Sequence, residues 1–448
     1  MLQTRKHPPG PGGAAAFFRG INRRQENPLK VIQELRDNFG NIIYIDFFIR
    51  KVYLVFEPEY IRQMLSEKAQ NYRKSSQYEK AELFLGQGML NSEGTFWKRQ
   101  RKLAQPAFLK SQVNHFHEMM LKHCNQVISE WRSRGDKNID VHSEMMRLTM
   151  NIIADAMFSM NLNKEASNIA ESLSFLNEYA SERIRSNFVL PVLVPTLDNL
   201  KFLSHSGRLN RLMYSIIEQR RKTPVEEMPK DLLTALVLSK DPETGETMSD
   251  LELRDELMTI FLAGHETTAM AMPMFFYNLT RNKPVLTKVL DEVRNTDIQS
   301  SEDLQKLTYT SMALQENLRL NPPAWVIGRR AIEDETLGDY YIQKDVDISM
   351  PIMILQRSPE YYERPLDFYP EHFSDAAIKA RPRYTYLPFG AGPRICIGKS
   401  FAEQEMMLIA WSFLKNLDLE SQTGQIELEP LFTLRPRQKI LMRAKKAP

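Results

Sequence analysis

The stretch FGAGPRICIGKS, residues 389–400, decides how the rest of the chain is interpreted, because it fits two unrelated chemistries. Its three glycines, lysine and serine suggest a phosphate-binding loop, whereas its arginine and cysteine suggest a metal ligand beside a cation. A P-loop has four residues between its first glycine and the Gly-Lys-Ser/Thr triplet. Here five residues separate Gly392 from Gly398, and Pro393 removes one of the N–H groups that would bind phosphate. Ile395 also stands where a G-x-G-x-x-G fingerprint requires its third glycine, so no nucleotide site is expected.

The metal-ligand interpretation rests on Cys396. Residues 399–414 have helical apolar spacing, so this cysteine would lie just before a helix N-terminus, where the helix dipole and free N–H groups favour a thiolate. The neighbouring glycines let the backbone turn tightly around the sulfur and direct N–H donors to it. A lone cysteine is more often a small buried hydrophobic residue, and we assign that role to Cys124, which lies in a helical run.

Length and composition narrow the class of protein. The chain has 448 residues, of which 42% are hydrophobic, so it can bury a large core. Its two cysteines do not make a disulfide framework and fit a reducing compartment. A formal net charge of +3 gives no indication of nucleic-acid binding. No run approaches the ~20 apolar residues of a membrane span, so we expect a soluble, cytoplasmic protein without a transmembrane anchor.

The pattern along the chain predicts one domain, residues 1–448, that is mainly helical with small sheets. Residues 1–20, which are rich in proline and glycine, are expected to form an extended N-terminal segment. The runs IIYIDFF (42–48) and VYLVF (52–56) predict a hairpin of two strands. Helical patterns dominate from about residue 93 to 320, and short strands follow.

Residues 248–282 predict a single long helix. Ser249 with Glu252 forms a capping box at its start. Its interior contains the poor helix formers Gly264 and Pro273, and a proline there costs ~3 kcal/mol. The glycine would open one face of the helix to the close approach of a bulky group.

Glu266 and Thr267 place an acid beside an alcohol within this helix and suggest a proton relay. The threonine hydroxyl could turn away from the carbonyl four residues earlier and loosen the helical ladder. The alternative is a kinked core helix with a solvated glutamate. A zinc-protease motif is excluded, because H-E-x-x-H requires a second histidine where this chain has Ala269.

Two more pairs of residues could contribute to a site. Glu316 and Arg319 are three residues apart on one helix face, and alone they would be an ordinary surface ion pair. Trp97 and Arg101 are one helical turn apart, so an indole and a guanidinium could meet a planar group that carries carboxylates. The alternative for the second pair is an amphipathic helix.

Together these stretches resemble the cytochrome P450 family of haem-thiolate monooxygenases, from about residue 8 to 446. FGAGPRICIG matches the F-x-x-G-x-R-x-C-x-G signature, AGHETT matches A/G-G-x-E/D-T-T/S, ENLR matches E-x-x-R, and FWKRQR matches W-x-x-x-R. The resemblance implies the single-domain cytochrome P450 fold, mainly α with small β-sheets. It also implies that haem b, iron protoporphyrin IX, is bound between a long distal helix and a proximal cysteine loop.

The resemblance assigns roles to individual residues. Cys396 would be the thiolate ligand of the haem iron, and Glu266 and Thr267 would deliver protons to bound dioxygen. Glu316 and Arg319 would support the cysteine loop. The remaining predicted haem contacts are Trp97, Arg101, Ala263, Gly264, Arg329, Phe389 and Arg394.

One position departs from the family pattern. The family usually has PERF, whose arginine is a third partner of the buried Glu–Arg pair, whereas this chain has PEHF, with His372. A histidine can accept from or donate to Glu316, but it titrates near neutral pH.

The implied activity is the insertion of one oxygen atom of O2 into a largely apolar organic substrate. A thiolate ligand favours O–O cleavage, and the cofactor supplies this chemistry. No flavin or ferredoxin segment is fused, so we expect electrons from a separate ferredoxin or flavodoxin with its reductase. Alternatives are a peroxide-driven peroxygenase, which would typically replace the Glu266–Thr267 pair, and a non-catalytic haem gas sensor, which would need an output module.

The helix that carries Trp97 also carries Lys98, Arg99 and Lys102. These residues predict part of a basic face that attracts an acidic redox partner. The alternative is a solvated helix face.

The predicted substrate pocket is apolar, which favours a largely hydrocarbon molecule. LRLNPPAWVIGRR, residues 318–330, is similar to the corresponding stretch of bacterial carotenoid-ring hydroxylases, and related sequences act on fatty acids. A terpenoid or carotenoid therefore ranks first and a fatty acid second. Residues 188–194 could make peripheral contact with a membrane, and a monomer is expected. The predicted pocket residues are Phe84, Leu85, Phe188, Phe261, Leu262, Ala324, Trp325, Val326, Leu431 and Phe432.

Overall fold

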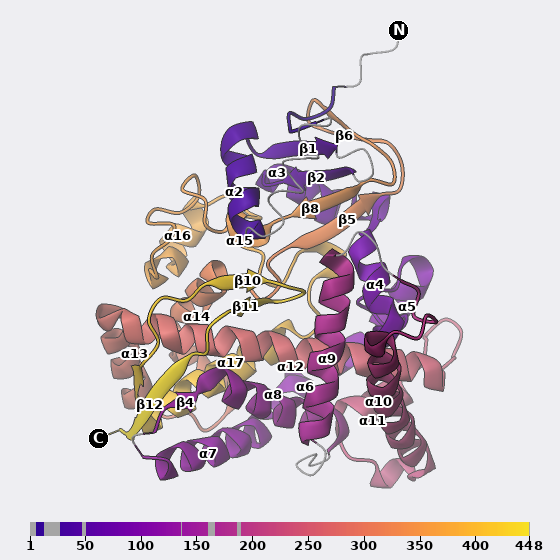
Figure 1. Cartoon of the computed structure of the whole chain (residues 1–448). Coiled ribbons are helices and arrows are strands. Elements are labelled where there is room, and N and C mark those ends of the chain that lie inside the picture. The colour runs from indigo at the N-terminus through magenta and orange to yellow at the C-terminus, as the bar shows by residue number, and fades with distance from the viewer. Residues whose placement is uncertain are drawn as a thin grey trace. The chain divides into compact units, whose positions relative to one another are not determined.

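The computed structural model is mainly helical with small sheets, as the sequence predicts (Figure 1). It describes residues 6–12, 27–46, 51–135, 137–159, 166–185 and 190–447. The chain divides into two compact units, which are treated separately below. Unit 1 comprises residues 1–77, 312–396 and 427–437. Unit 2 comprises residues 78–311, 397–426 and 438–448.

Unit 1 is built on a five-stranded sheet with the order β1-β2-β8-β5-β3. The predicted hairpin is confirmed: β1 and β2 are antiparallel, with Ile42 opposite Val55. Strand β8 joins β2 in parallel, so segments far apart in the sequence form one sheet. In the described part of the N-terminal segment, the Pro9 carbonyl accepts from the Tyr44 N–H at 3.0 Å, so residues 6–12 run along β1. The strands are β1 Ile42–Asp46, β2 Lys51–Val55, β3 Tyr72–Lys74, β5 Ile327–Ala331 and β8 Asp347–Met350.

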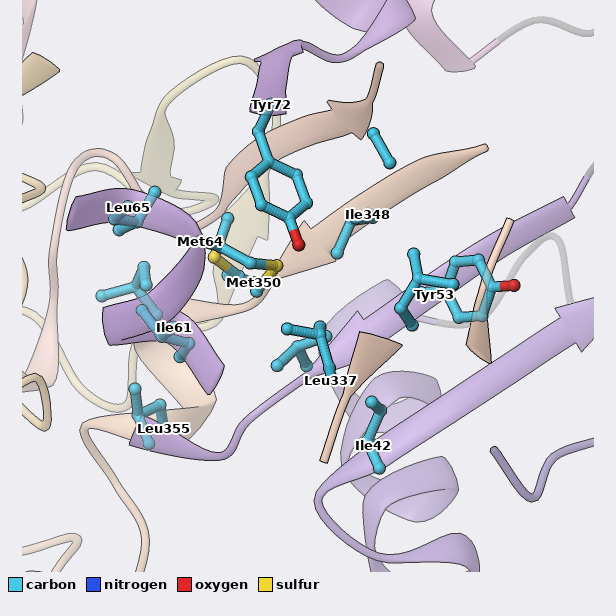
Figure 2. Packing of buried hydrophobic residues seen from close by; sticks show 14 of the residues in the cluster. Ile42, Tyr53, Ile61, Met64, Leu65, Tyr72, Leu337, Ile348, Met350 and Leu355 are labelled. Atoms are coloured by element: carbon cyan, nitrogen blue, oxygen red, sulfur yellow. The ribbon is translucent and has the colours of Figure 1, made fainter. Parts of the chain in front are cut away.

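One face of this sheet carries an apolar core (Figure 2). Tyr53 and Ile348 lie on adjacent strands, and both are wholly buried with Leu337. Helical residues such as Ile61 complete the cluster. The other elements of unit 1 are α2 Pro28–Phe39, α3 Pro58–Arg62, η1 Gln63–Glu67, β6 Glu335–Leu337, β7 Tyr340–Ile342, α15 Ile352–Leu355, η6 Pro370–Phe373, α16 Asp375–Ala380, η7 Gly392–Arg394, β10 Leu428–Pro430 and β11 Leu434–Pro436. Helix α14, Thr308–Leu320, begins in unit 2 and continues into unit 1.

Unit 2 is dominated by helices, and the longest of them is α12, Asp250–Arg281. The predicted capping box is confirmed, because the Ser249 side chain accepts from the Glu252 N–H and the Glu252 side chain accepts from the Ser249 N–H. The helix passes through Pro273 without a break. The other helices are α4 Ser76–Leu85, which starts at the end of unit 1, α5 Gly94–Ala104, α6 Lys110–Asn114, α7 His117–Ser133, α8 Val141–Phe158, α9 Ala166–Arg185, α10 Leu197–Lys222, α11 Leu232–Leu238, α13 Lys283–Asn295 and α17 Lys399–Asn416. Strands β4 Ile139–Asp140, β12 Leu441–Lys446 and β9 Leu417–Ser421 form a three-stranded sheet.

Helices α8 and α12 are bound closely together. The Thr149 hydroxyl donates to the His265 carbonyl at 3.0 Å, and His265 Nε2 donates to the Met146 carbonyl at 3.0 Å. A Cβ placed on Gly264 would lie 2.9 Å from Cδ1 of Ile153, closer than real side chains approach. The bulky group that approaches this glycine is therefore the side chain of Ile153.

Among the residues that the structure describes, no helix combines the length and the apolar character needed to cross a membrane.

Candidate active site

Cys396 lies in a short loop between η7 and α17, and its side chain is exposed. Its N–H donates to the Phe389 carbonyl at 2.9 Å, and the Gly390 N–H donates to the Leu387 carbonyl at 3.0 Å. These bonds close the loop around the cysteine. Cys124 is fully buried as predicted, and burial raises the pKa of its thiol to about 12. The two cysteines therefore differ as expected: one is accessible to a ligand and the other is part of the core.

Backbone conformation and close packing explain why two positions of the loop are glycine. Gly390 and Gly392 have φ values of +70° and +69°, which side chains rarely adopt. A Cβ on Gly392 would lie 1.7 Å from the Leu65 carbonyl oxygen, so the loop packs directly on the backbone of η1. No other residue fits at this position without moving one of the two segments.

Glu316 and Arg319 form a fully buried ion pair in unit 1, so the surface-pair alternative is wrong. Arg319 Nε and Nη2 donate to the two carboxylate oxygens of Glu316, each at 2.7 Å. His372 Nδ1 lies 3.2 Å from both of these oxygens. Removing one partner of a buried ion pair lowers the stability of a protein by about 3–5 kcal/mol. These contacts therefore fix α14 and the segment of His372 to each other.

The buried ion pair is connected to the cysteine loop through Gln356. Arg319 Nη1 donates to the carbonyls of Gln356 and Pro365, each at 2.7 Å. The Gln356 side chain accepts from the Leu387 N–H at 2.7 Å and donates to the Arg319 carbonyl at 3.0 Å. Leu387 in turn accepts from Gly390 at the start of the loop. The sequence gives no motif for Gln356, because its partners are backbone groups from distant segments.

Two predicted pocket segments meet within unit 1. Trp325 Nε1 donates to the Leu431 carbonyl at 2.8 Å, so the segment before β5 lies against the turn between β10 and β11. The side chains of Trp325, Val326, Leu431 and Phe432 are half-buried, and Ala324 is exposed. Arg329, on β5, is buried.

In unit 2, the stretch of α12 that is predicted to bind oxygen contains residues that are not buried, although the helix around it is buried. Between Asp255 and Phe276 every residue of α12 is buried except Ala263, Gly264 and Thr267. Thr267 lies three positions after Gly264 and four after Ala263, so it neighbours both of them on the helix surface. The Thr267 hydroxyl donates to the Ala263 carbonyl at 2.7 Å. The sequence analysis suggested that this hydroxyl turns away from the carbonyl, and the structure does not show such a turn.

Glu266 is buried, so the solvated-glutamate alternative is wrong. Its carboxylate accepts a hydrogen bond from the side-chain amide of Asn177 on α9. The sequence does not predict a role for Asn177, because this residue lies in an ordinary amphipathic run and contacts Glu266 only through the packing of two helices. The amide therefore holds this carboxylate in a defined position within the core.

Trp97 and Arg101 lie on α5 and line one open pocket of about 430 Å³ in unit 2. Lys98 and Lys102 are also on its wall, so the pocket is basic and suits carboxylates. The predicted basic face is smaller than expected. Arg99 Nη1 lies 2.7 Å from Glu252, and Lys102 Nζ lies 2.8 Å from Glu243, so the chain itself partly neutralises both cations.

The predicted pocket residues of unit 2 are buried. Phe84 and Leu85 lie on α4, and Phe261 and Leu262 on α12. The Phe261 ring packs against Phe158 of α8 with a centroid distance of 6.0 Å. Phe188 lies outside the described residues. The role of all these residues in binding substrate stays a prediction.

Comparison with known proteins decides the family. The family model described as Cytochrome P450 matches residues 8–446. The chain is a cytochrome P450.

This P450 is 32% identical to cyclooctatin synthase of Streptomyces melanosporofaciens over 407 residues, which cover 90% of the chain and 88% of that protein. It is 29% identical over 428 residues to a self-sufficient cytochrome P450 monooxygenase of Phanerodontia chrysosporium, covering 92% of the chain but only 40% of that longer relative. It is also 27% identical over 419 residues to LUTEIN DEFICIENT 5 of Arabidopsis thaliana, covering 88% and 69%. Like other members of its family, this P450 is an oxidoreductase that uses O2, haem and a redox partner.

The residues present fit haem. An exposed thiol in a loop of constrained backbone offers one soft anionic ligand for iron. The basic pocket at Trp97 and Arg101 offers donors for carboxylates. The small uncovered patch of Ala263, Gly264 and Thr267 lies on an otherwise buried helix.

Proposed function

We propose that this P450 inserts one oxygen atom of O2 into a largely hydrocarbon substrate, with a terpenoid or carotenoid ranked above a fatty acid. The observation that carries the haem-thiolate chemistry is the link from the buried Glu316–Arg319 pair through Gln356 to the loop of Cys396. Such support keeps a thiolate ligand in place while the protein binds and releases substrate.

The chain would hold the cofactor through one thiolate and several cations. Cys396 would hold the haem iron through its thiolate, with Phe389 beside the sulfur. The predicted partners of the haem propionates are Trp97, Arg101, Arg329 and Arg394. When bound, the haem supplies the binding and reductive activation of O2.

The protons would come through α12. Thr267 holds its hydroxyl on the Ala263 carbonyl, at the uncovered patch of the helix. Glu266 is the adjacent acid, and Asn177 keeps its carboxylate in a defined position. A rotation of the threonine hydroxyl away from the carbonyl would let it donate to a ligand at this face.

The substrate class is supported by two observations. The half-buried segments that meet at Trp325 and Leu431 are largely apolar and offer few polar groups to replace lost hydration. Two relatives, cyclooctatin synthase and LUTEIN DEFICIENT 5, have names that refer to a terpenoid product and a carotenoid.

Electrons would come from a separate ferredoxin or flavodoxin with its reductase, and residues 1–448 would act as one monomeric, cytoplasmic monooxygenase domain. The self-sufficient relative is more than twice as long as the matched region, so this chain corresponds to a part of that protein.

The start of α10 supports peripheral contact with a membrane. Leu193 and Leu197 are 94% and 78% exposed, and Leu200 and Leu203 continue the apolar row along the helix. An exposed lysine, Lys201, lies beside them and could reach anionic headgroups. Co-sedimentation with anionic vesicles should decrease in a Leu193→Ser/Leu197→Ser variant. Equal sedimentation of both proteins would contradict the contact.

The experiment that tests the substrate class is a spin-state titration of the holoprotein with carotenoids, terpenes, fatty acids and small polar compounds. We expect a clear shift with the apolar compounds, and a shift with polar compounds alone would overturn the proposal. Turnover with a reductase system but not with hydrogen peroxide would exclude the peroxygenase alternative. A product formed with peroxide alone would favour it.

A further inference from the structure

We infer that the acidic turn at residues 241–246 competes with an acidic redox partner for the basic face of α5, so that the partner must displace Glu243 from Lys102 when it docks. The basic face consists of Lys98, Arg99 and Lys102. This competition rests on the proposed function, because an acidic ferredoxin or flavodoxin is taken as the electron donor.

The turn has a backbone of fixed shape. Asp241 is buried, and its Oδ1 accepts from the N–H of Glu243 at 2.8 Å. The N–H of Asp241 donates to the Glu246 carbonyl, and its carbonyl accepts from the Gly245 N–H, both at 2.8 Å. Gly245 has a φ of +74°, which side chains rarely adopt. These bonds hold Glu243 at the surface, where its side chain is 82% exposed.

Arg99 and Lys102 are bound to acidic residues in different ways. Arg99 Nη1 lies 2.7 Å from Glu252 Oε1, and Arg99 Nη2 donates to the Thr247 carbonyl at 3.1 Å. The side chains of Arg99 and Glu252 are 21% and 19% exposed, so this contact joins α5 to the start of α12. Lys102 Nζ lies 2.8 Å from Glu243 Oε1, and both of these side chains are exposed. An exposed ion pair contributes little to stability, so Lys102 is the cation that a partner can take over.

A carboxylate of an acidic partner would make the same contact with Lys102 that Glu243 makes. Two carboxylates on one ammonium group repel each other, so the partner binds this lysine only as Glu243 leaves it. Leaving requires a rotation of the Glu243 side chain and no opening of the turn, whose backbone bonds are its own. Glu246, whose side chain is 69% exposed, adds a second negative charge at this edge. The turn therefore weakens docking, whereas the exposed Lys98 favours it.

The test is the affinity of the holoprotein for an acidic plant-type ferredoxin with a two-iron, two-sulfur cluster, measured by titration calorimetry at low ionic strength, where charges are least screened. Glu243→Gln should lower the Kd about twofold to fivefold, as expected for the release of one exposed ion pair. This gain should vanish at high salt. A Kd for Glu243→Gln that is not below the wild-type value would overturn the inference.

The matched control is Glu226→Gln, which removes the same charge from an exposed position of η4, Val225–Glu227. This substitution should change the Kd much less than Glu243→Gln does. Equal gains in the two variants would show that only the net charge matters and would overturn the competition.

A double-mutant cycle separates the occupation of Lys102 from a local effect of charge. In a Lys102→Gln background, Glu243→Gln has no ammonium group to release, so it should give no further gain in affinity. An equal gain in both backgrounds would show that Glu243 acts through its charge alone, and this result would also overturn the competition.

Lys98→Glu distinguishes a failure of the inference from a failure of the proposed docking. A weaker affinity in Lys98→Glu together with an unchanged affinity in Glu243→Gln overturns the competition and leaves docking at α5 in place. No response to either substitution overturns both. Because the measurement needs neither turnover nor substrate, the proposed oxygenation is tested independently of it.

Discussion

The side-chain oxygen of Gln356 accepts a hydrogen bond from the N–H of Leu387 at 2.7 Å, and this bond joins the buried ion-pair cluster to the loop of Cys396. Gln356 is wholly buried, and its amide nitrogen donates to the carbonyls of Leu318 and Arg319. One glutamine thus satisfies three backbone groups from two segments.

Replacing this glutamine should weaken the loop. Gln356→Leu would leave the Leu387 N–H and two carbonyls unpaired, at a cost of about 1–3 kcal/mol for each buried group left without a partner. We expect a lower free energy of unfolding in urea and faster haem loss. Gln112→Leu, at an exposed position of α6, serves as the control and should change neither quantity. Equal stabilities of the two variants would refute the role of Gln356.

The ligand assignment predicts a spectroscopic loss. Cys396→Ser should abolish the thiolate signature of the ferrous–CO complex, because a neutral hydroxyl is a poor donor to iron. Cys124→Ala should retain the signature, since this thiol is buried in the core of unit 2. A strongly red-shifted Soret band that persists in Cys396→Ser would disprove the assignment.

The proton relay predicts uncoupling. Thr267→Ala removes the hydroxyl at the uncovered face of α12, so the variant should retain haem but divert most electrons from product to hydrogen peroxide. Thr267→Ser keeps the hydroxyl and should remain mostly coupled. The measurement is the ratio of product to reductant consumed. An unaltered ratio in Thr267→Ala would exclude the relay.

Glu405 predicts a pH dependence of stability. This carboxyl lies on α17 and is wholly buried, its two oxygens have no hydrogen-bond partner among the described residues, and burial raises its pKa to about 8. An unfolded glutamate releases its proton near pH 4.5, while the folded protein keeps it until about pH 8. Between these values the folded state binds the extra proton, so the free energy of unfolding should fall by up to about 1.4 kcal/mol per pH unit as pH rises.

Glu405→Gln should reduce this slope and stabilise the protein at pH 8, measured by urea denaturation across the range. Part of the slope should remain, because burial also raises the pKa of Glu256 on α12 to about 8. Glu118→Gln, at an exposed position, should keep the slope. A wild-type stability that does not change between pH 5 and 8 would show that the buried carboxyl is ionised.

The basic face of the α5 helix, with Lys98, Arg99 and Lys102, predicts where an acidic redox partner docks. Lys98 is exposed, whereas Arg99 is engaged with Glu252 at the start of α12. Lys98→Glu should slow reduction by an acidic ferredoxin by up to about tenfold at low ionic strength, with little loss of stability. Arg99→Glu should instead lower the melting temperature. Reduction rates that depend neither on ionic strength nor on Lys98→Glu would contradict docking at this basic face.

Local sequence patterns predicted the helices and strands, whereas the side-chain contacts between distant segments became visible only in the structure. The capping box at Ser249 and the hairpin of β1 and β2 were predictable because their signals lie within a few residues. The contacts of Glu266 with Asn177 and of Arg99 with Glu252 join segments 89 and 153 residues apart. No periodicity or spacing encodes such meetings, since they depend on how whole helices pack. For the same reason the sequence indicated a basic face but not its partial neutralisation.

Gly264 and Ile153 share one small volume, since a Cβ on the glycine would lie within 2.9 Å of the isoleucine side chain. The two positions are therefore not independent in evolution or in design. A larger residue at 264 makes the Ile153 side chain shift or favours a shorter residue at 153, and a shorter residue at 153 alone leaves a void between α8 and α12. Libraries that aim to reshape this part of α12 should vary the two positions as a pair, because a shorter residue at 153 would give a side chain at 264 the room that Ile153 now fills.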